Sequence, residues 1–167
     1  MPFTMHDASV KPMRHMLRNL SNLLSKAAAH CEARKIDPNA LLQSRLYPDM
    51  FPLVRQVQIA SDTAKGAAAR LAGVELPKFE DTEVTFGDLQ ARIDKTVAFL
   101  DSLQPAQFDG AESRQVVLQL RDRSLEFTGG DYLATWANPN FYFHVTTAYA
   151  LLRHGGVEVG KGDYLGG

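Results

Sequence analysis

Apolar residues recur at alternating steps of three and four in four separate segments of the chain. The first stripe runs from Val10 to Cys31 and the second from Met50 to Leu71. The third runs from Phe86 to Leu103, and the fourth from Phe141 to Leu152. Because a helical turn takes 3.6 residues, each stripe predicts a helix with one face packed against its neighbours. The pattern therefore predicts an all-α fold built around a four-helix bundle.

Local signals predict the ends of the first two helices. Ser9 is a candidate N-cap for the first helix, which places Pro12 in its first turn. Asp49 has the same role for the second helix, again with a proline, Pro52, in the first turn. Gly73 is predicted to end the second helix as the residue after its C-cap.

The third and fourth helices carry similar signals. Thr85 and Asp88 have the spacing of a capping box at the start of the third helix, and Pro105 stops it. The fourth helix is predicted to begin at Asn138, with Pro139 at its first helical position, and to end at Gly155–Gly156.

A β-hairpin is predicted between the third and fourth helices. Val116, Leu118 and Leu120 alternate with polar residues, as do Leu125 and Phe127 after the polar stretch Arg121–Ser124. Alternation with a period of two is typical of a half-buried strand. A connection of this length usually covers one end of a core or carries function.

Two further segments have weaker patterns. We expect a short extra helix within Pro38–Ser44 and an irregular, glycine-rich tail from Val157 to Gly167. The stretch Gly155–Gly162 imitates a phosphate-binding loop, but a glycine stands where that loop needs a hydroxyl, and the stretch follows a helix. We therefore reject nucleotide binding through this loop.

Composition limits the class of protein. The chain has 167 residues, 45% of them apolar and 22% charged, which predicts one globular domain over residues 1–167. A net charge of −1 offers no basic surplus for nucleic acid. The single cysteine, Cys31, cannot form an intrachain disulfide. Residues 1–7 lack a signal-peptide pattern and no apolar run would span a bilayer, so we expect a cytoplasmic protein without membrane contact.

His144 is the main candidate for chemistry. Two histidine ligands on one helix must lie three or four residues apart, and no pair among the histidines has that spacing: His6, His15, His30, His144 and His154. His144 falls on the inward stripe of the fourth helix, amid Trp136, Phe141, Tyr142 and Phe143, and one turn after Asn140. A buried histidine satisfied by a neighbour is the simpler interpretation. The alternative is a ligand-binding or acid–base group at the open end of the bundle.

Polar residues on the second helix extend this candidate site. Gln58, with Asp62 one turn later, is predicted to face the same cavity, and Gln56 is the competing candidate for Gln58. A solvated helix face is the simpler interpretation of both positions. The acidic residues Glu80, Asp81 and Glu83 are expected to form a solvent-facing linker.

The segments Met50–Gly73, Asn138–Gly156 and Gly160–Gly166 resemble an uncharacterised bacterial domain-of-unknown-function family within the DinB/YfiT-like superfamily. The resemblance implies a four-helix bundle with an up-down-down-up arrangement, often as a homodimer. Many members of the superfamily bind a divalent metal through three histidines, one on the second helix and two spaced by four on the last. Characterised relatives include thiol-dependent transferases and isomerases.

By this resemblance, the metal positions fall on Gln58, Asn140 and His144. Only one histidine is retained, and neutral amides are weak ligands for transition ions, so we expect no bound metal and no other cofactor. The leading hypothesis is a degenerate metal site that binds a small molecule in a pocket lined by Gln58, Asp62, Trp136, Asn140, Tyr142 and His144. One alternative is a metal-dependent or thiol-dependent transferase or hydrolase-like enzyme that uses His144. The other is a structural or regulatory homodimer without catalysis.

Overall fold

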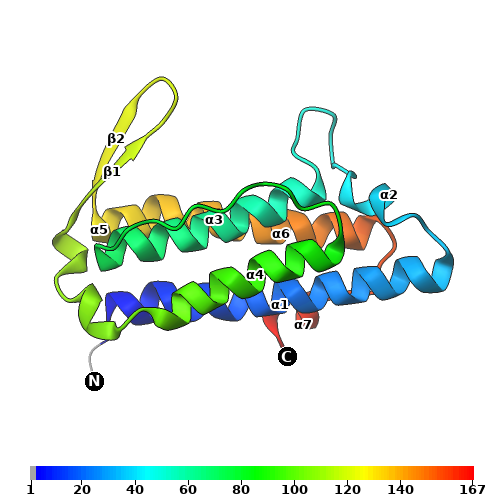
Figure 1. Cartoon of the computed structure of the whole chain (residues 1–167), viewed down its shortest axis with the longest axis horizontal. Helices are drawn as coiled ribbons and strands as arrows, with labels where there is room; N and C mark the ends of the chain where they lie inside the picture. Colours follow the sequence, from blue (N-terminus) through cyan, green and yellow to red (C-terminus); the bar gives the residue numbers. More distant parts are fainter. Residues whose placement is uncertain (1–2) are drawn as a thin grey trace.

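The computed structural model describes residues 3–167, and four long helices dominate this part of the chain (Figure 1). They are α1 (Met5–Arg34), α3 (Leu53–Ala72), α4 (Phe86–Ser102) and α6 (Asn138–His154). Helix α3 packs against α6, α4 and α1, and α1 also packs against α4 and α6. The mostly helical fold predicted by the apolar stripes is confirmed.

The four apolar stripes meet in one hydrophobic core. Leu17, Leu20 and Leu24 of α1 are fully buried in it, as is Phe141 of α6. The core-facing positions of α3 are mostly alanines, from Ala60 to Ala69, and these too are fully buried. Their short side chains let α6 and α4 approach α3 closely, which brings polar groups on neighbouring helices within hydrogen-bonding reach.

Helix α1 begins earlier than its sequence signals suggested. Thr4 Oγ1 accepts a hydrogen bond from the Asp7 amide (3.1 Å), and Asp7 Oδ2 accepts one from the Thr4 amide (3.0 Å). This reciprocal capping box satisfies two free amides, whereas a lone serine satisfies one. The prediction that Ser9 caps the helix is therefore wrong: Ser9 lies within α1 and its hydroxyl donates to Met5 O. Pro12 lies inside the helix as a result.

The start of α3 also differs from the prediction. Asp49 does not cap this helix, because Pro52 occupies the N-cap position and the Leu53 amide donates to Ser44 O (2.9 Å). Residues 43–52 instead form a loop that projects from the body (Figure 1). The end of α3 at Gly73 is confirmed, with φ +69° in the left-handed region that favours glycine. The short helix between α1 and α3 is also confirmed, as α2 (Pro38–Leu42).

The segment from α4 to α6 follows the sequence prediction closely. The Thr85–Asp88 capping box is present, and α4 ends at Ser102. Two short 3₁₀ helices follow, η1 (Pro105–Phe108) and η2 (Ala111–Ser113). Strands β1 (Gln115–Gln119) and β2 (Ser124–Thr128) then pair antiparallel, with Val116 opposite Phe127 and Leu118 opposite Leu125. The predicted hairpin is confirmed.

Helix α6 begins at Asn138 as predicted, but the backbone before it is already helical. The short helix α5 (Gly129–Asp131) leads into a π-helix, η3 (Tyr132–Ala137), which continues directly into α6. A proline within a helix lacks the N–H that bonds to the carbonyl four residues earlier, and its ring clashes with that carbonyl. The wider π-turn just before Pro139 relieves this conflict.

The expectation of an irregular tail is wrong in part, because residues Lys161–Leu165 form a short helix, α7. This helix lies against α1 (Figure 1). Asn19 Nδ2 donates to Tyr164 O (3.0 Å), and Lys26 forms an ion pair with Asp163 (2.6 Å). These partners lie more than a hundred residues apart in the sequence, so a local pattern does not reveal them.

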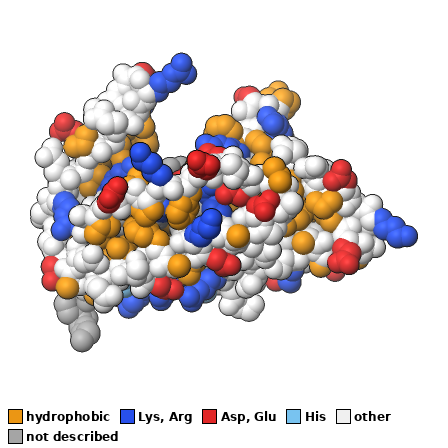
Figure 2. Space-filling view, in the orientation of Figure 1, with side chains coloured by type: hydrophobic (Ala, Val, Ile, Leu, Met, Phe, Trp, Pro, Cys, Tyr) orange, Lys and Arg blue, Asp and Glu red, His pale blue; other side chains and the backbone are white. Residues whose placement is uncertain are grey.

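The connection between α3 and α4 runs back along α3, so that α4 starts at the end of the molecule where α3 also starts (Figure 1). We call residues Gly73–Thr85 the crossover segment. The β-hairpin and the loop of residues 43–52 rise from the same side of the helices, with a depression between them (Figure 2). Within residues 3–167, every helix is too short or too polar to traverse a lipid bilayer.

Candidate functional site

His144 is held by a glutamine on the neighbouring helix. The residue is only 8% exposed, and its Nδ1 lies 2.7 Å from Oε1 of Gln56 on α3. The ring of Phe143 meets the imidazole edge to face, with 5.1 Å between the ring centroids. Of the two glutamines that the sequence left as alternatives, Gln56 is therefore the one that contacts His144.

The hydrogen bonds of Gln56 fix the tautomer of His144. Gln56 Nε2 donates to the backbone carbonyl of Phe51 (3.0 Å), and a carbonyl can only accept. The amide oxygen of Gln56 must then face the imidazole, so His144 Nδ1 carries the proton and donates it. The lone pair is left on Nε2, which has no hydrogen-bond partner within residues 3–167. Nε2 of His144 is not fully buried in this part of the chain, so it retains contact with solvent.

The charge state of His144 follows from the same surroundings. Burial lowers the pKa of this imidazole, because the charged form loses its hydration, and the positive charge of Arg55 lowers it further. The ring is therefore neutral at neutral pH. A neutral imidazole with a proton fixed on Nδ1 presents Nε2 as a hydrogen-bond acceptor.

Replacing Gln56 with glutamate is expected to raise the pKa of His144, because the new carboxylate favours the imidazolium. In the natural chain the folded-state pKa lies below the unfolded value of about 6.5. The unfolded chain therefore takes up the proton first, and His144 lowers stability as the pH falls below that value. The substitution opposes this loss. An NMR titration of the His144 ring, with chemical unfolding at several pH values, measures both effects.

Gln43→Glu is the matched control, since Gln43 is exposed at the end of α2 and makes no hydrogen bond to the imidazole, whose Nδ1 is bonded to Gln56. It should leave the titration of His144 unchanged. A pKa of His144 that does not rise in Gln56→Glu would contradict the Nδ1–Oε1 hydrogen bond.

The other residues predicted for this pocket are only partly brought together. Tyr142 and Phe143 line an open hollow of about 420 Å³ between α6 and Leu46. Asn140 lies half-buried one turn before His144 on α6. Trp136 packs instead on Phe127 of the hairpin, with 6.0 Å between ring centroids. The aromatic contact of His144 therefore comes from Phe143, and Phe51 contributes its backbone carbonyl through Gln56. Phe51 was not predicted because it lies in a loop, where no periodic pattern marks it.

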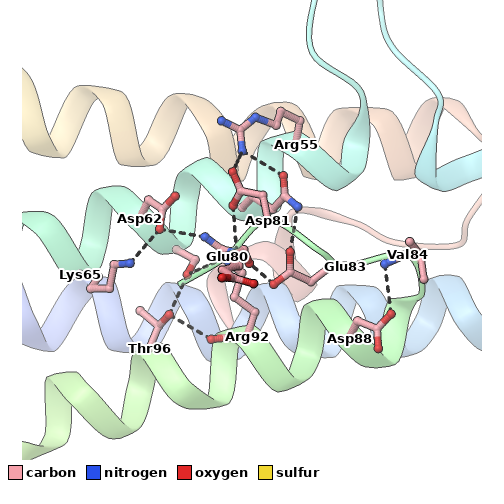
Figure 3. A network of polar contacts seen from close by, with 12 residues as sticks. Arg55, Asp62, Lys65, Glu80, Asp81, Glu83, Val84, Asp88, Arg92 and Thr96 are labelled. Carbon is pink, nitrogen blue, oxygen red and sulfur yellow. Dashed lines mark hydrogen bonds and ion pairs between the residues drawn. The ribbon is translucent and has the colours of Figure 1, made fainter. Parts of the chain in front are cut away.

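Gln58 and Asp62 belong to a different site, on the side of α3 that faces α4 (Figure 3). Gln58 Nε2 donates to Glu83 Oε2 (2.8 Å). Asp62 accepts from Arg92 Nη2 (2.8 Å) and pairs with Lys65 (3.0 Å). The structure thus separates these two residues from His144, because residues 56 and 58 point about 200° apart around a helix.

Arg92 is the centre of this second site, which we call the Arg92 network. Its side chain is only 1% exposed and forms ion pairs with Asp62 (2.8 Å), Asp81 (3.0 Å) and Glu83 (3.0 Å). It also donates to the backbone carbonyl of Glu80 (3.1 Å). Figure 3 shows Arg92 reaching from α4 into the space between α3 and the crossover segment.

The expectation of a solvent-facing linker at Glu80, Asp81 and Glu83 is therefore wrong. A buried guanidinium requires carboxylates to compensate its charge, and the crossover segment supplies two of them. Burial opposes the ionisation of Glu83, but hydrogen bonds from Gln58 and Arg92 outweigh it and hold the pKa of Glu83 below its ordinary value. The network fastens the crossover segment to α3 and α4.

The residues around His144 are a poor fit for a transition metal. Nδ1 of His144 is already engaged by Gln56, and the remaining nearby groups are amides and aromatic rings. Gln58 is turned toward Glu83. Across residues 3–167, histidine, cysteine and acidic side chains do not form a group of three that would hold a metal ion. Amide oxygens bind zinc and similar ions weakly, so this donor set does not match the superfamily's three histidines.

Comparison with known proteins identifies the family. The family model described as "Domain of unknown function (DUF1993)" matches residues 5–165. No curated protein matches the chain. A solved structure described as a DinB family member protein from Shewanella denitrificans is 45% identical, with a TM-score of 0.92, and the match covers 98% of this chain and 92% of that one. These findings confirm the resemblance seen in the sequence, and the chain belongs to the DUF1993 family of DinB-like proteins.

Proposed function

We propose that this protein binds a small organic molecule at His144, with an O–H or N–H group of the ligand donating to Nε2. The observation that carries the proposal is the chain of hydrogen bonds from Phe51 O through Gln56 to His144 Nδ1. That chain fixes the tautomer and leaves one oriented lone pair. A protein acceptor in this state is prepared for a ligand donor without reorganisation.

Binding is a better fit than general-base catalysis by His144. In catalytic triads, a carboxylate at Nδ1 stabilises the imidazolium that forms during the reaction. Here the Nδ1 partner is a neutral amide, and both burial and Arg55 disfavour the charged ring. We therefore place the thiol-dependent and metal-dependent alternatives behind ligand binding, and we propose that the site works without a bound metal.

The neighbouring surface suits an apolar ligand body. Phe51, Phe143 and Leu46 are each about half exposed, although large apolar side chains are usually buried. Phe143 lines the hollow beside α6 and also contacts the His144 ring. A ligand that combines an aromatic or aliphatic body with a hydroxyl or amine group matches these features.

The experiment uses benzyl alcohol as the probe and the ¹⁵N-labelled full chain at pH 7.5. We expect long-range ¹H–¹⁵N spectra to show a protonated Nδ1 and an unprotonated Nε2 on His144. Benzyl alcohol should shift the Nε2 resonance toward that of a hydrogen-bonded nitrogen, whereas toluene, which lacks the donor, should not. His144→Ala should abolish the chemical-shift changes at Phe143, and the exposed-residue control His154→Ala should retain them.

Two results would overturn the proposal. One is a proton on Nε2 in the free protein, since the acceptor would then be missing. The other is an Nε2 resonance that does not respond to benzyl alcohol or to a panel of small alcohols, amines and amides at millimolar concentration.

We also infer the finer topology, an up-down-down-up order of α1, α3, α4 and α6. The crossover segment supports it, because a chain that runs back along α3 before α4 begins makes α3 and α4 parallel (Figure 1). The homodimer expected from the superfamily remains a prediction, which light scattering of the purified protein would test.

A further inference from the structure

Arg55 has an unused hydrogen-bonding edge next to the His144 site. Both of its side-chain bonds come from Nη1, to Gln58 Oε1 (3.0 Å) and to Asp81 Oδ2 (2.5 Å). Its Nε and Nη2 make no hydrogen bond within residues 3–167. The side chain as a whole is 35% exposed. The Nε–Nη2 edge of a guanidinium has the geometry to bind a carboxylate through two parallel bonds.

Arg55 and His144 are both linked to Phe51, Arg55 through the Phe51 ring and His144 through Gln56. The guanidinium carbon of Arg55 lies 5.8 Å from the centre of the Phe51 ring. The backbone carbonyl of Phe51 holds the amide of Gln56, which in turn holds His144. The positive charge of Arg55 also contributes to lowering the pKa of the His144 imidazole. Arg55 therefore adds a cationic donor to a site that otherwise offers a neutral acceptor and aromatic rings.

The Arg92 network holds Arg55 in place. Asp81 bonds to Arg55 through one carboxylate oxygen and to the buried Arg92 (3.0 Å) through the other. Gln58, which also contacts Arg55, is bonded to Glu83 of the same network. Two fixed acceptors on Nη1 orient the plane of the guanidinium, and pre-orientation lowers the entropy lost when a ligand binds. The network thus links the crossover segment to the site.

Resting on the proposed function, we infer that the ligand of this site is a small hydroxy acid with an apolar body. Its carboxylate accepts hydrogen bonds from Nε and Nη2 of Arg55, and its hydroxyl donates to Nε2 of His144. The apolar body packs on Phe51 and Phe143. A simple carboxylate satisfies Arg55 but offers no donor to His144, and a simple alcohol satisfies only His144. A hydroxy acid satisfies both.

Three related probes separate the two contacts. Mandelate carries both groups, phenylacetate lacks the hydroxyl, and benzyl alcohol lacks the carboxylate. We expect mandelate to bind at least about tenfold more tightly than either of the others, since each lost contact removes a hydrogen bond to a charged or buried group. NMR titration of the His144 and Phe143 resonances at pH 7.5 measures the three dissociation constants.

Arg55→Met tests the carboxylate contact, because methionine keeps an apolar stem and removes the charge. The variant should bind mandelate no more tightly than benzyl alcohol. Benzyl alcohol should still shift the Nε2 resonance of His144 in this variant, which shows that the His144 site has survived the substitution. Arg18→Met, which removes a cation that is 58% exposed on α1, is the matched control and should leave all three affinities unchanged.

The outcomes distinguish this inference from the proposed function. If mandelate and benzyl alcohol bind equally well to the natural chain, the hydroxy-acid inference is wrong and binding at His144 stands. If mandelate binds more tightly but Arg55→Met does not weaken it, the carboxylate is held elsewhere and the inference is also wrong. If none of the probes moves the His144 resonances, the proposed function itself fails.

Discussion

Replacing Arg92 with methionine is expected to lower the free energy of unfolding by about 3–5 kcal/mol, which is the usual cost of removing one partner from a buried ion pair. The guanidinium of Arg92 compensates Asp62, Asp81 and Glu83 in a setting where its own side chain is 1% exposed. Without it, Glu83 is left as a largely buried carboxylate, and the crossover segment loses its attachment to α4. Urea unfolding followed by circular dichroism measures the loss.

The control for this prediction is Arg18→Met, which removes a surface cation that pairs with Asp101 at 3.4 Å. An exposed pair contributes less than about 1 kcal/mol, so this variant should unfold close to the natural chain. Adding Glu83→Gln to Arg92→Met should recover part of the loss, because it removes the uncompensated charge. Equal losses from Arg92→Met and Arg18→Met would show that the network contributes little to stability.

The pH dependence gives an independent check. Because the folded-state pKa of Glu83 lies below its unfolded value, its contribution is present above the unfolded pKa and is lost as the pH falls through the folded one. This acid-side loss of stability should be smaller in Glu83→Gln. The natural chain and the variant can be compared by unfolding at pH values between neutral and about 3, which spans the ordinary range of a glutamate carboxyl.

Gly129→Ala is expected to destabilise the protein by about 3 kcal/mol, at the upper end of the usual cost of overpacking. Gly129 begins α5 where the hairpin joins the helices, and a methyl group there would overlap the backbone carbonyl of Ala111. That carbonyl belongs to η2 and cannot move without displacing the 3₁₀ turn. In a chain of 167 residues, each kcal/mol lowers the melting temperature by about 2–4 °C.

Gly130→Ala is the matched comparison, one residue further along the same helix. The nearest atom to an added methyl group there is Glu112 O at 3.4 Å, which is an ordinary contact. Alanine is the better helix former, so this variant should be neutral or slightly more stable. Similar melting temperatures for the two variants would contradict the close approach of α5 and η2.

The long helices and the hairpin were predictable because buried positions recur at regular intervals and are occupied by apolar residues, so their spacing can be read from the sequence. The stripe from Phe86 to Leu103 and the Thr85–Asp88 capping box are local signals, and both were confirmed. The start of α1 was missed because Ser9 and Thr4 both precede plausible helical turns, and only the Asp7 partner decides between them. Helix α7 was missed because its stability comes from distant contacts with Asn19 and Lys26.

The site was predictable only in part, for a geometric reason. Periodicity placed His144 on the inward face of its helix, and the structure puts it there. The choice between Gln56 and Gln58 depends on the rotation of α3 relative to α6, and half a turn is within the uncertainty of a stripe made largely of alanines. The Arg92 network was not predicted, since Arg92 sits in a helix whose charged residues otherwise face solvent.

The contact between α7 and α1 has a consequence during synthesis of the chain. Asn19 and Tyr164 are separated by 145 positions, so Asn19 leaves the ribosome long before its partner. Until then α7 covers neither its flank of α1 nor the ring of Tyr149, which packs on Tyr164, and apolar surface that is exposed for a time makes a chain prone to aggregate. This flank of α1 is therefore covered only once α7 has been made, and a variant that lacks residues 161–167 should be more prone to aggregate.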